Sequence, residues 1–431
     1  RCGGTVALAS GASQTGFGRT GTVDWITAPK TATFTAVSGE GYFCNTSGGA
    51  FTANLPAGVA GAIVSLADYA ATWDINNITV TPNGTDKIGS LNNNAILNTL
   101  GQSVTFVFVD STQGWINTMD STSNVRGASN FLLATGGTVT TSGDCKIHTF
   151  TGPGTFCVSA IGAVSANNQV SYMAVAGGGG GGWDRAGGGG AGGFREDKSP
   201  ITPYTASPLE GAGPITVTAT GFPIIVGAGG VGGLNNSIPQ FRGNGGSVSS
   251  FSTITSTGGG GGGSAPGCKM PGLPGGSGGG TSGPSSSAGS GNTPPVSPSQ
   301  GFPGGIAPAP GGGDHGAGGG GATAAGVPGA GTSPVGAGGA GATTSIFGSI
   351  NAYAGGGGGG YSDGAAGSGA GGDGGLGGGG DGGNYPGGLG AAGTTNTGGG
   401  GGGGSNGPNS SPAGNGGAGG SGIVIIRYKF Q

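Results

Sequence analysis

Residues 167–196 read NNQVSYMAVAGGGGGGWDRAGGGGAGGFRE, and this stretch decides the architecture of the second half of the chain. Its apolar run at 170–176 has the length and composition of a buried β-strand, and it leads directly into six glycines. Two later stretches place a phenylalanine, then an isoleucine three residues later, before six more glycines (Phe251, Ile254 and 258–263; Phe347, Ile350 and 355–360). A pattern of an apolar strand followed by polyglycine occurs more than once in the chain. Such recurrence indicates a repeated structural unit.

Glycine makes up 118 of the 431 residues, and 95 of these glycines lie after residue 172. A composition this rich in glycine and proline usually indicates disorder. Polyglycine can also adopt an extended threefold helix that rises about 3.1 Å per residue and has no internal hydrogen bonds. Because N–H and C=O groups need partners when they are buried, such helices would have to bond laterally. We therefore expect packed polyglycine II helices after residue 172, with a flexible linker as the alternative.

The composition also argues against several classes of protein. The 13 Lys and Arg residues against 16 Asp and Glu give a net charge of −3, without the basic clusters of a nucleic-acid-binding protein. No apolar run reaches the length of about 18 residues that a membrane span needs, so we do not expect a membrane-embedded chain. Collagen requires glycine at every third position, and uninterrupted runs such as 177–182 break that register.

Residues 1–125 show a different pattern, with short apolar or alternating segments bounded by Gly, Asn, Asp and Pro. These segments lie at 31–37, 42–46, 50–55, 61–70, 77–84, 103–110 and 114–119. Alternation with a period of two is typical of half-buried antiparallel strands, and no useful stretch has a helical period. The sequence predicts an N-terminal antiparallel β module.

This first region resembles a β module of bacteriophage tail-fibre proteins. The resemblance rests on three stretches in order: GEGYFCNTSGGAFTANLPA at 39–57, VSLADYAATWDINNITVTPNGTDKIGS at 64–90, and TFVFVDSTQGWINTMDSTSNV at 105–125. Each stretch alone is a weak signal, and their common order is a fairly specific one. Cys2 and Cys44 are not part of the family pattern.

The rest of the chain resembles a glycine-rich domain at the distal ends of phage tail fibres and related virion proteins. The matching text is TGGTVTTSGDCKIHTFTGPGTFCVSA at 135–160, the strand that runs into polyglycine, and the closing GGAGGSGIVIIRYKFQ at 416–431. Met173 and Ala174 stand where the family commonly has longer aliphatic residues. Residues 151–154, Thr-Gly-Pro-Gly, have the chemistry of a hairpin loop.

Together these observations predict an all-β chain in three parts. Residues 1–125 form the tail-fibre module, residues 126–172 form a β-hairpin that begins the glycine-rich domain, and residues 173–431 form the polyglycine domain, closed by a strand at 422–430. The strand signals at 215–229, 247–257 and 343–354 lie inside this last part.

Five aromatic residues lie within or beside the glycine-rich segments, where little apolar core is available to bury them. We consider them candidates for contact with a receptor, and the alternative is that they fill gaps between glycine helices. They are Trp183, Phe194, Tyr204, Tyr361 and Tyr385.

The five cysteines, Cys2, Cys44, Cys145, Cys157 and Cys268, are widely spaced and contain no C-x-x-C pair. They allow buried free thiols or disulfides, within or between chains. The sequence has only two histidines, so it gives no support for a zinc site or other metal site. His148 is expected to pack locally rather than to act in catalysis.

No catalytic constellation appears, so the chain is not expected to be an enzyme or to hold a cofactor. The resemblance instead implies a virion fibre protein of a tailed phage, commonly a homotrimer, located outside the cell. Its implied partners are other tail proteins and a host surface glycan or outer-membrane protein, which it would bind non-covalently. The alternative is a purely structural virion component, such as a head fibre, tail decoration or filament subunit, without receptor binding.

Overall fold

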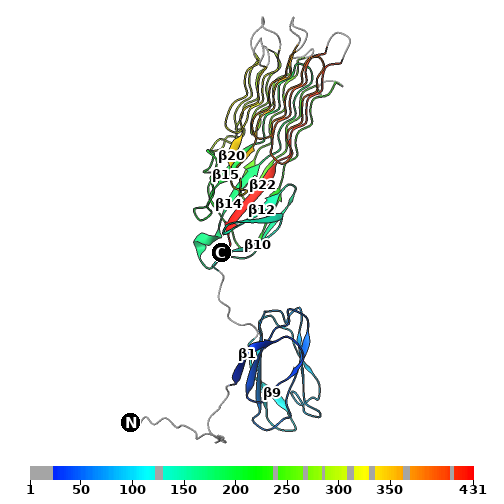
Figure 1. The fold of residues 1–431 in the computed structure, drawn as a ribbon, viewed down its shortest axis with the longest axis vertical. Coiled ribbons are helices and arrows are strands. Elements are labelled where there is room, and N and C mark those ends of the chain that lie inside the picture. Colours follow the sequence, from blue (N-terminus) through cyan, green and yellow to red (C-terminus); the bar gives the residue numbers. More distant parts are fainter. Residues whose placement is uncertain are drawn as a thin grey trace, which may run out of the picture. The chain divides into compact units, whose positions relative to one another are not determined.

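The computed structural model describes residues 23–121, 130–235, 241–265, 270–283, 287–307, 315–329, 335–362, 369–407 and 412–431. The chain divides into two compact units, residues 1–127 and 128–431. Nearly all of the regular secondary structure described in both units is β-strand, so the predicted all-β class is confirmed. The one helical element described is the short 3-10 turn η1 (Ser165–Asn168). Figure 1 shows the two units.

The first unit contains two sheets. The five-stranded sheet has the order β1 (Asp24–Lys30), β3 (Glu40–Cys44), β5 (Ile63–Asp68), β8 (Ser103–Phe108) and β9 (Trp115–Ser121). The four-stranded sheet has the order β2 (Phe34–Thr35), β4 (Phe51–Asn54), β6 (Ile78–Thr81) and β7 (Ala95–Leu97).

The predicted antiparallel pairing is confirmed for the pairs β5–β8, β8–β9 and β6–β7, and it is wrong for the pairs that the first six strands form with one another. β1, β3 and β5 pair in parallel, as do β2, β4 and β6. The chain alternates between the two sheets, so each link between paired strands passes through the opposite sheet and the neighbours run in the same direction. Side chains alternate with a period of two in parallel and antiparallel strands alike. The hydrophobic pattern therefore could not distinguish the two arrangements.

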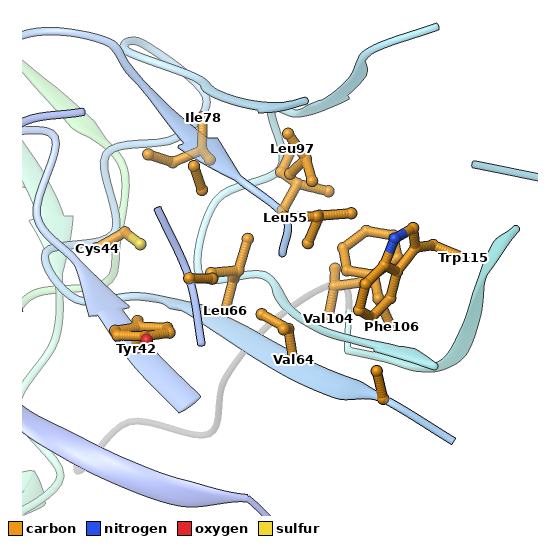
Figure 2. Packing of buried hydrophobic residues seen from close by; sticks show 14 of the residues in the cluster. Tyr42, Cys44, Leu55, Val64, Leu66, Ile78, Leu97, Val104, Phe106 and Trp115 are labelled. Atoms are coloured by element: carbon orange, nitrogen blue, oxygen red, sulfur yellow. The ribbon is translucent and has the colours of Figure 1, made fainter. Parts of the chain in front are cut away.

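Side chains from both sheets of the first unit meet in one apolar core. Figure 2 shows Leu66 from β5, Phe106 from β8 and Trp115 from β9 packed with residues of the second sheet and its loops. The Asp68 carboxylate accepts hydrogen bonds from the backbone N–H groups of Thr72 and Gly101 and so fixes the ends of two loops.

The second unit contains a six-stranded sheet that forms its centre. The order is β11 (Thr138–Ser142), β12 (Cys145–Phe150), β22 (Ile423–Lys429), β14 (Gln169–Val175) and β15 (Phe194–Asp197), with β16 (Ile215–Thr216) also paired to β14. A five-stranded sheet has the order β10 (Leu133–Thr135), β13 (Gly154–Ala160), β17 (Gly221–Ile225), β18 (Ser249–Phe251) and β19 (Ile254–Ser256). β20 (Ala342–Thr344) and β21 (Asn351–Tyr353) form a separate pair.

The central strands β14 and β22 bury both of their faces. Tyr172 and Ile426 belong to one apolar cluster, and Met173 and Ile425 belong to another on the opposite face. All four side chains are fully buried. Burial on both faces explains why VSYMAVA and GIVIIRY are nearly continuous apolar runs rather than alternating ones.

Four local predictions for this unit are wrong. Residues 151–154 do not close a hairpin, because β12 and β13 belong to different sheets; the hairpin is formed by β11 and β12. The segments 247–257 and 343–354 are each a pair of short strands rather than one strand. The segment 215–229 is likewise split between β16 and β17. In each case a Gly, Ser or Pro residue within the apolar run allows a turn or a change of sheet.

Candidate functional site: the glycine-rich lattice and its far end

The glycine runs continue the hydrogen bonding of the central sheet beyond its strands. Val175 at the end of β14 is in register with Phe194 of β15 and with Ile423 of β22. The next N–H group, that of Ala176, donates to the carbonyl of Gly193 at 3.1 Å. Figure 1 shows the runs side by side beyond the strands. The strands therefore set the positions at which the glycine runs start.

Backbone hydrogen bonds in the run 177–182 follow a period of three residues. Every third N–H group donates to the same neighbouring segment, and three segments are reached in turn. Gly177 and Gly180 donate to Ser247 and Asn244, Gly178 and Gly181 donate to Gly420 and Gly417, and Gly179 and Gly182 donate to Gly190 and Gly187.

The carbonyl groups of the same run accept hydrogen bonds from three further segments. The donors are Gly259 and Gly262, Gly230 and Gly233, and Gly401 and Gly404. The run is therefore bonded on all sides, and its polar backbone groups are satisfied without strand pairing or an internal helix. The run 355–360 shows the same pattern, since Gly356, Gly357 and Gly358 donate to three different segments.

Close backbone approach explains why these positions are glycine. A Cβ on Gly189 would lie 2.1 Å from the carbonyl oxygen of Gly179, and one on Gly357 would lie 2.1 Å from that of Gly401. Both contacts are to backbone atoms, which cannot move aside as a flexible side chain can. We call these laterally hydrogen-bonded glycine segments the glycine lattice. Its backbones lie so close together that a residue with a side chain would not fit at these positions, so glycine is required there.

The end of the lattice that is far from the strands carries an aromatic pair that the sequence did not predict. Trp183 stacks on Phe241 with ring centroids 4.9 Å apart. The indole Nε1–H of Trp183 donates to the carbonyl of Ala413 at 3.1 Å. Asp184 and Arg185, which follow Trp183, have φ of 58° and 49°, a conformation that is uncommon for residues other than glycine. This turn reverses the chain between the runs 177–182 and 187–193.

The predicted receptor-contact residues do not form one site. Trp183 and Tyr385 are half-buried residues within the lattice, and Tyr204 is half-buried against the core next to β15. Phe194 is 1% exposed and Tyr361 is 8% exposed. For Phe194 and Tyr361 the prediction of surface contact is wrong, because their rings are covered by other residues.

Each buried aromatic has a packing role. Phe194 lies on β15 in the apolar cluster that also contains Met173 and Ile425. The Tyr361 ring packs on His315 at a centroid distance of 4.6 Å, and His315 Nδ1 accepts a hydrogen bond from the N–H of Ser362. The alternative that aromatic residues fill gaps between glycine segments therefore describes Tyr361.

The three described cysteines are free thiols. Cys44 and Cys145 are fully buried, and Cys157 is exposed on β13. Burial raises the pKa of the Cys44 thiol to about 12, and nearby Asp68 acts in the same direction. A disulfide among these three is thus ruled out in this structure, while Cys2 and Cys268 lie outside the described residues.

His148 packs locally, as predicted. Its Nδ1 lies 2.7 Å from the carbonyl oxygen of Gly136, and its Nε2 lies 3.3 Å from the Tyr428 hydroxyl. The ring also stacks on Tyr428 and meets Phe156 edge to face. Burial lowers the pKa of His148, so its neutral form is favoured, with Nδ1–H as the donor to Gly136.

A buried carboxyl group at Glu196 joins β15 to two other elements. Nothing in the sequence pointed to this role beyond the position of Glu196 after a glycine run. The Ser207 N–H donates to Oε2 at 2.9 Å, and the Thr344 hydroxyl donates to Oε1 at 2.6 Å. Burial raises the pKa of Glu196, and the hydrogen bonds oppose this shift. The arrangement is suited to fixing the loop 198–213 against β20.

None of the groups of His, Cys, Asp and Glu side chains in the described residues has three or more members placed to hold a metal ion. In the same parts of the chain, no helix has the length and apolar character needed to cross a membrane.

Comparison with known proteins identifies the larger unit. No curated protein matches the chain. A family model described as a glycine-rich domain matches residues 149–429, which is more than half of the chain. The match includes the glycine lattice, β14 and β22. The chain belongs to this glycine-rich domain family.

Proposed function

We propose that the chain is a fibre protein of a tailed-phage virion, with the far end of its glycine-rich unit placed to contact the host cell surface. The observation that carries the proposal is the three-residue hydrogen-bond period of the run 177–182, which bonds to segments on all sides. Such a lattice holds its segments rigidly without a large apolar core. The resemblance of both units to tail-fibre segments supports the same assignment.

We also infer that the glycine runs are polyglycine II helices. A threefold extended helix presents every third residue to the same neighbour, which matches the observed alternation of hydrogen-bond partners. A crystal structure with φ near −75° and ψ near +145° along the run 177–182 is the expected result. Torsion angles of ordinary β-strands in that run would contradict this inference.

Host attachment in this proposal is non-covalent and multivalent. A homotrimer, or several fibres on one particle, would combine weak contacts so that the avidity exceeds any single affinity. Trp183 and Arg185 are the most suitable contact residues, because both are half-buried rather than buried and lie at the turn far from the strands. The chain would act outside the cell with other tail proteins as its partners.

The test uses labelled full-length chain and a panel of bacterial strains with different envelopes. We expect selective binding to some strains, and at least tenfold weaker binding when Trp183→Ala and Arg185→Ala are combined. Phe347→Ala is the matched control, because Phe347 is 40% exposed and lies in the β20–β21 loop next to the strands. Binding to no strain, together with immunogold label along the head or tail shaft, would instead support the purely structural role.

A further inference from the structure

Two neighbouring rows of side chains in register lie on the outward face of the five-stranded sheet in the first unit. One row crosses all five strands, and its residues are Trp25, Gly41, Ser65, Thr105 and Met119. The next row crosses four strands, and its residues are Phe43, Ala67, Ser103 and Ser121. The core-facing rows alternate with these. Small residues thus occupy the middle of the sheet, between large residues at its sides.

Trp25 forms one wall of the resulting trough. A Cβ on Gly41 would lie 2.8 Å from Cδ2 of Trp25, so the indole ring occupies the space that a side chain at position 41 would fill. The ring also packs against Phe43 with centroids 4.9 Å apart. Although it is supported in this way, Trp25 remains 43% exposed. Glycine at position 41 therefore allows the indole to form a fixed, accessible aromatic wall.

The floor of the trough is polar and uncharged. The Ser65 and Thr105 hydroxyls are 2.7 Å apart and hydrogen-bonded to each other, and both residues are buried at the bottom. A bond between two hydroxyls uses one donor and one acceptor, so the pair keeps a further donor and further lone pairs. Met119 forms the opposite wall and is 58% exposed. The hollow between the walls has a volume of about 270 Å³.

The charge of the lining restricts the occupant. Neither row contains a charged side chain. Asp120 also borders the hollow, but it is in register with the core residue Val104, and its carboxylate accepts hydrogen bonds from Gln102 and Asn117. The lining contains no Lys, Arg or His side chain, so a phosphate or a nucleic acid would find no positive counter-charge in this trough.

We propose that the trough binds a neutral saccharide. The apolar face of a sugar ring fits against a fixed aromatic surface such as the Trp25 indole, because both are flat and apolar. The sugar hydroxyls then find donors and acceptors in the Ser65–Thr105 pair on the floor. Few polar groups in a mainly apolar concavity are typical of a site that orients a small ligand. This site lies in the first unit and does not depend on the proposed function of the glycine-rich unit.

The experiment uses the full chain and an array of neutral, amino and acidic oligosaccharides, followed by titration of the best neutral binder. Trp73 and Trp115 are fully buried, so in a Trp183→Phe background the accessible tryptophan signal comes from Trp25. We expect saturable quenching or a blue shift of this fluorescence on binding. Trp25→Ala removes the fluorescent reporter, so its affinity is measured by isothermal titration calorimetry, and it should be at least tenfold weaker than that of the parent. Thr105→Val, which removes a hydroxyl at nearly constant shape, should weaken binding several-fold.

Ile96→Ala is the matched control, because Ile96 is 59% exposed and lies on the other sheet. Its affinity and fluorescence response should equal those of the parent. Melting curves of every variant verify folding, and Thr105→Val retains the trough if Trp25→Ala fails to fold. The proposal is overturned if no neutral saccharide binds, if binding survives Trp25→Ala and Thr105→Val unchanged, or if Trp25→Ala only alters the mass of an oligomer.

Discussion

A Cβ atom on Gly179 would lie 2.2 Å from the carbonyl oxygen of Gly260, because the two glycine runs pass each other backbone to backbone. Gly179 also donates a hydrogen bond to Gly190, in a third segment. One residue thus contacts two other segments, and the segment of Gly260 is far away in sequence. Beyond the apolar clusters that surround the strands, the glycine runs are ordered by such backbone contacts.

Gly179→Ala should destabilise the second unit by about 1–3 kcal/mol or more, because the added methyl group can be accommodated only by separating backbones. Gly152→Ala is the matched control, since a Cβ at position 152 meets nothing within 4 Å. The measurement is chemical denaturation of both variants. Equal stabilities would show that the lattice tolerates side chains, contrary to the packing described.

Phe156→Ala should cost about 3–5 kcal/mol, because a large buried aromatic is removed from the main core of the second unit. The Phe156 ring is packed against the rings of His148, Phe222, Phe251 and Tyr428. Phe347→Ala should change the stability by less than about 0.5 kcal/mol, since Phe347 is exposed. Thermal and denaturant unfolding give both values, and a large effect at Phe347 would contradict its exposed position.

The stability of the second unit should decrease as the pH falls below about 6.5, the ordinary pKa of histidine. Burial lowers the pKa of His148 in the folded state, so between the two pKa values the unfolded chain binds a proton that the folded chain does not. Melting temperatures between pH 8 and pH 5 measure this loss. His148→Gln should flatten the profile in that range, and an unchanged slope would rule out His148 as its source.

Glu196 should have the opposite effect. Burial raises the pKa of its carboxyl group in the folded state, so the associated stability is present at low pH and is lost as the pH rises through the folded-state value. Glu196→Gln should reduce this loss on the alkaline side. The control is Glu210→Gln at an exposed position, which should follow the parent profile. If both variants behave alike, the loss does not arise from Glu196.

Thiol reactivity should separate the cysteines. In a Cys2→Ser, Cys268→Ser background, Cys157 should react rapidly with Ellman's reagent in the native protein because it is exposed. Cys44 and Cys145 should react only after unfolding, since both are buried and the pKa of Cys44 is raised to about 12. Rapid reaction of all three native thiols would be inconsistent with this burial.

The sequence was sufficient to predict the strands that anchor the glycine-rich unit. VSYMAVA and GIVIIRY are long apolar runs, which are readily interpreted as buried strands. They form the paired strands β14 and β22. Shorter signals were less reliable. Phe251–Ile254 and Phe347–Ile350 share the same spacing, yet Phe251 and Ile254 are buried while Phe347 and Ile350 are exposed. The spacing of two apolar residues along the chain does not show whether they will pack against another sheet or remain exposed.

The candidate contact residues show the same limit. Trp183, Phe194 and Tyr361 have similar glycine-rich surroundings in sequence, but only Trp183 remains partly accessible. Its partner Phe241 lies 58 positions away, and no local signal connects the two. The trough beside Trp25 was also not predicted, because it depends on the registers of five strands.

By itself, the sequence determined the all-β class and the places where strands end in glycine, since apolar runs favour burial and consecutive glycines exclude an ordinary core. Only the tertiary structure decided which segments lie beside one another. A glycine run has no side chains that could distinguish its neighbours, and its N–H and C=O groups can pair with any other run. The register of the anchoring strands, such as Val175 beside Phe194 and Ile423, makes that choice.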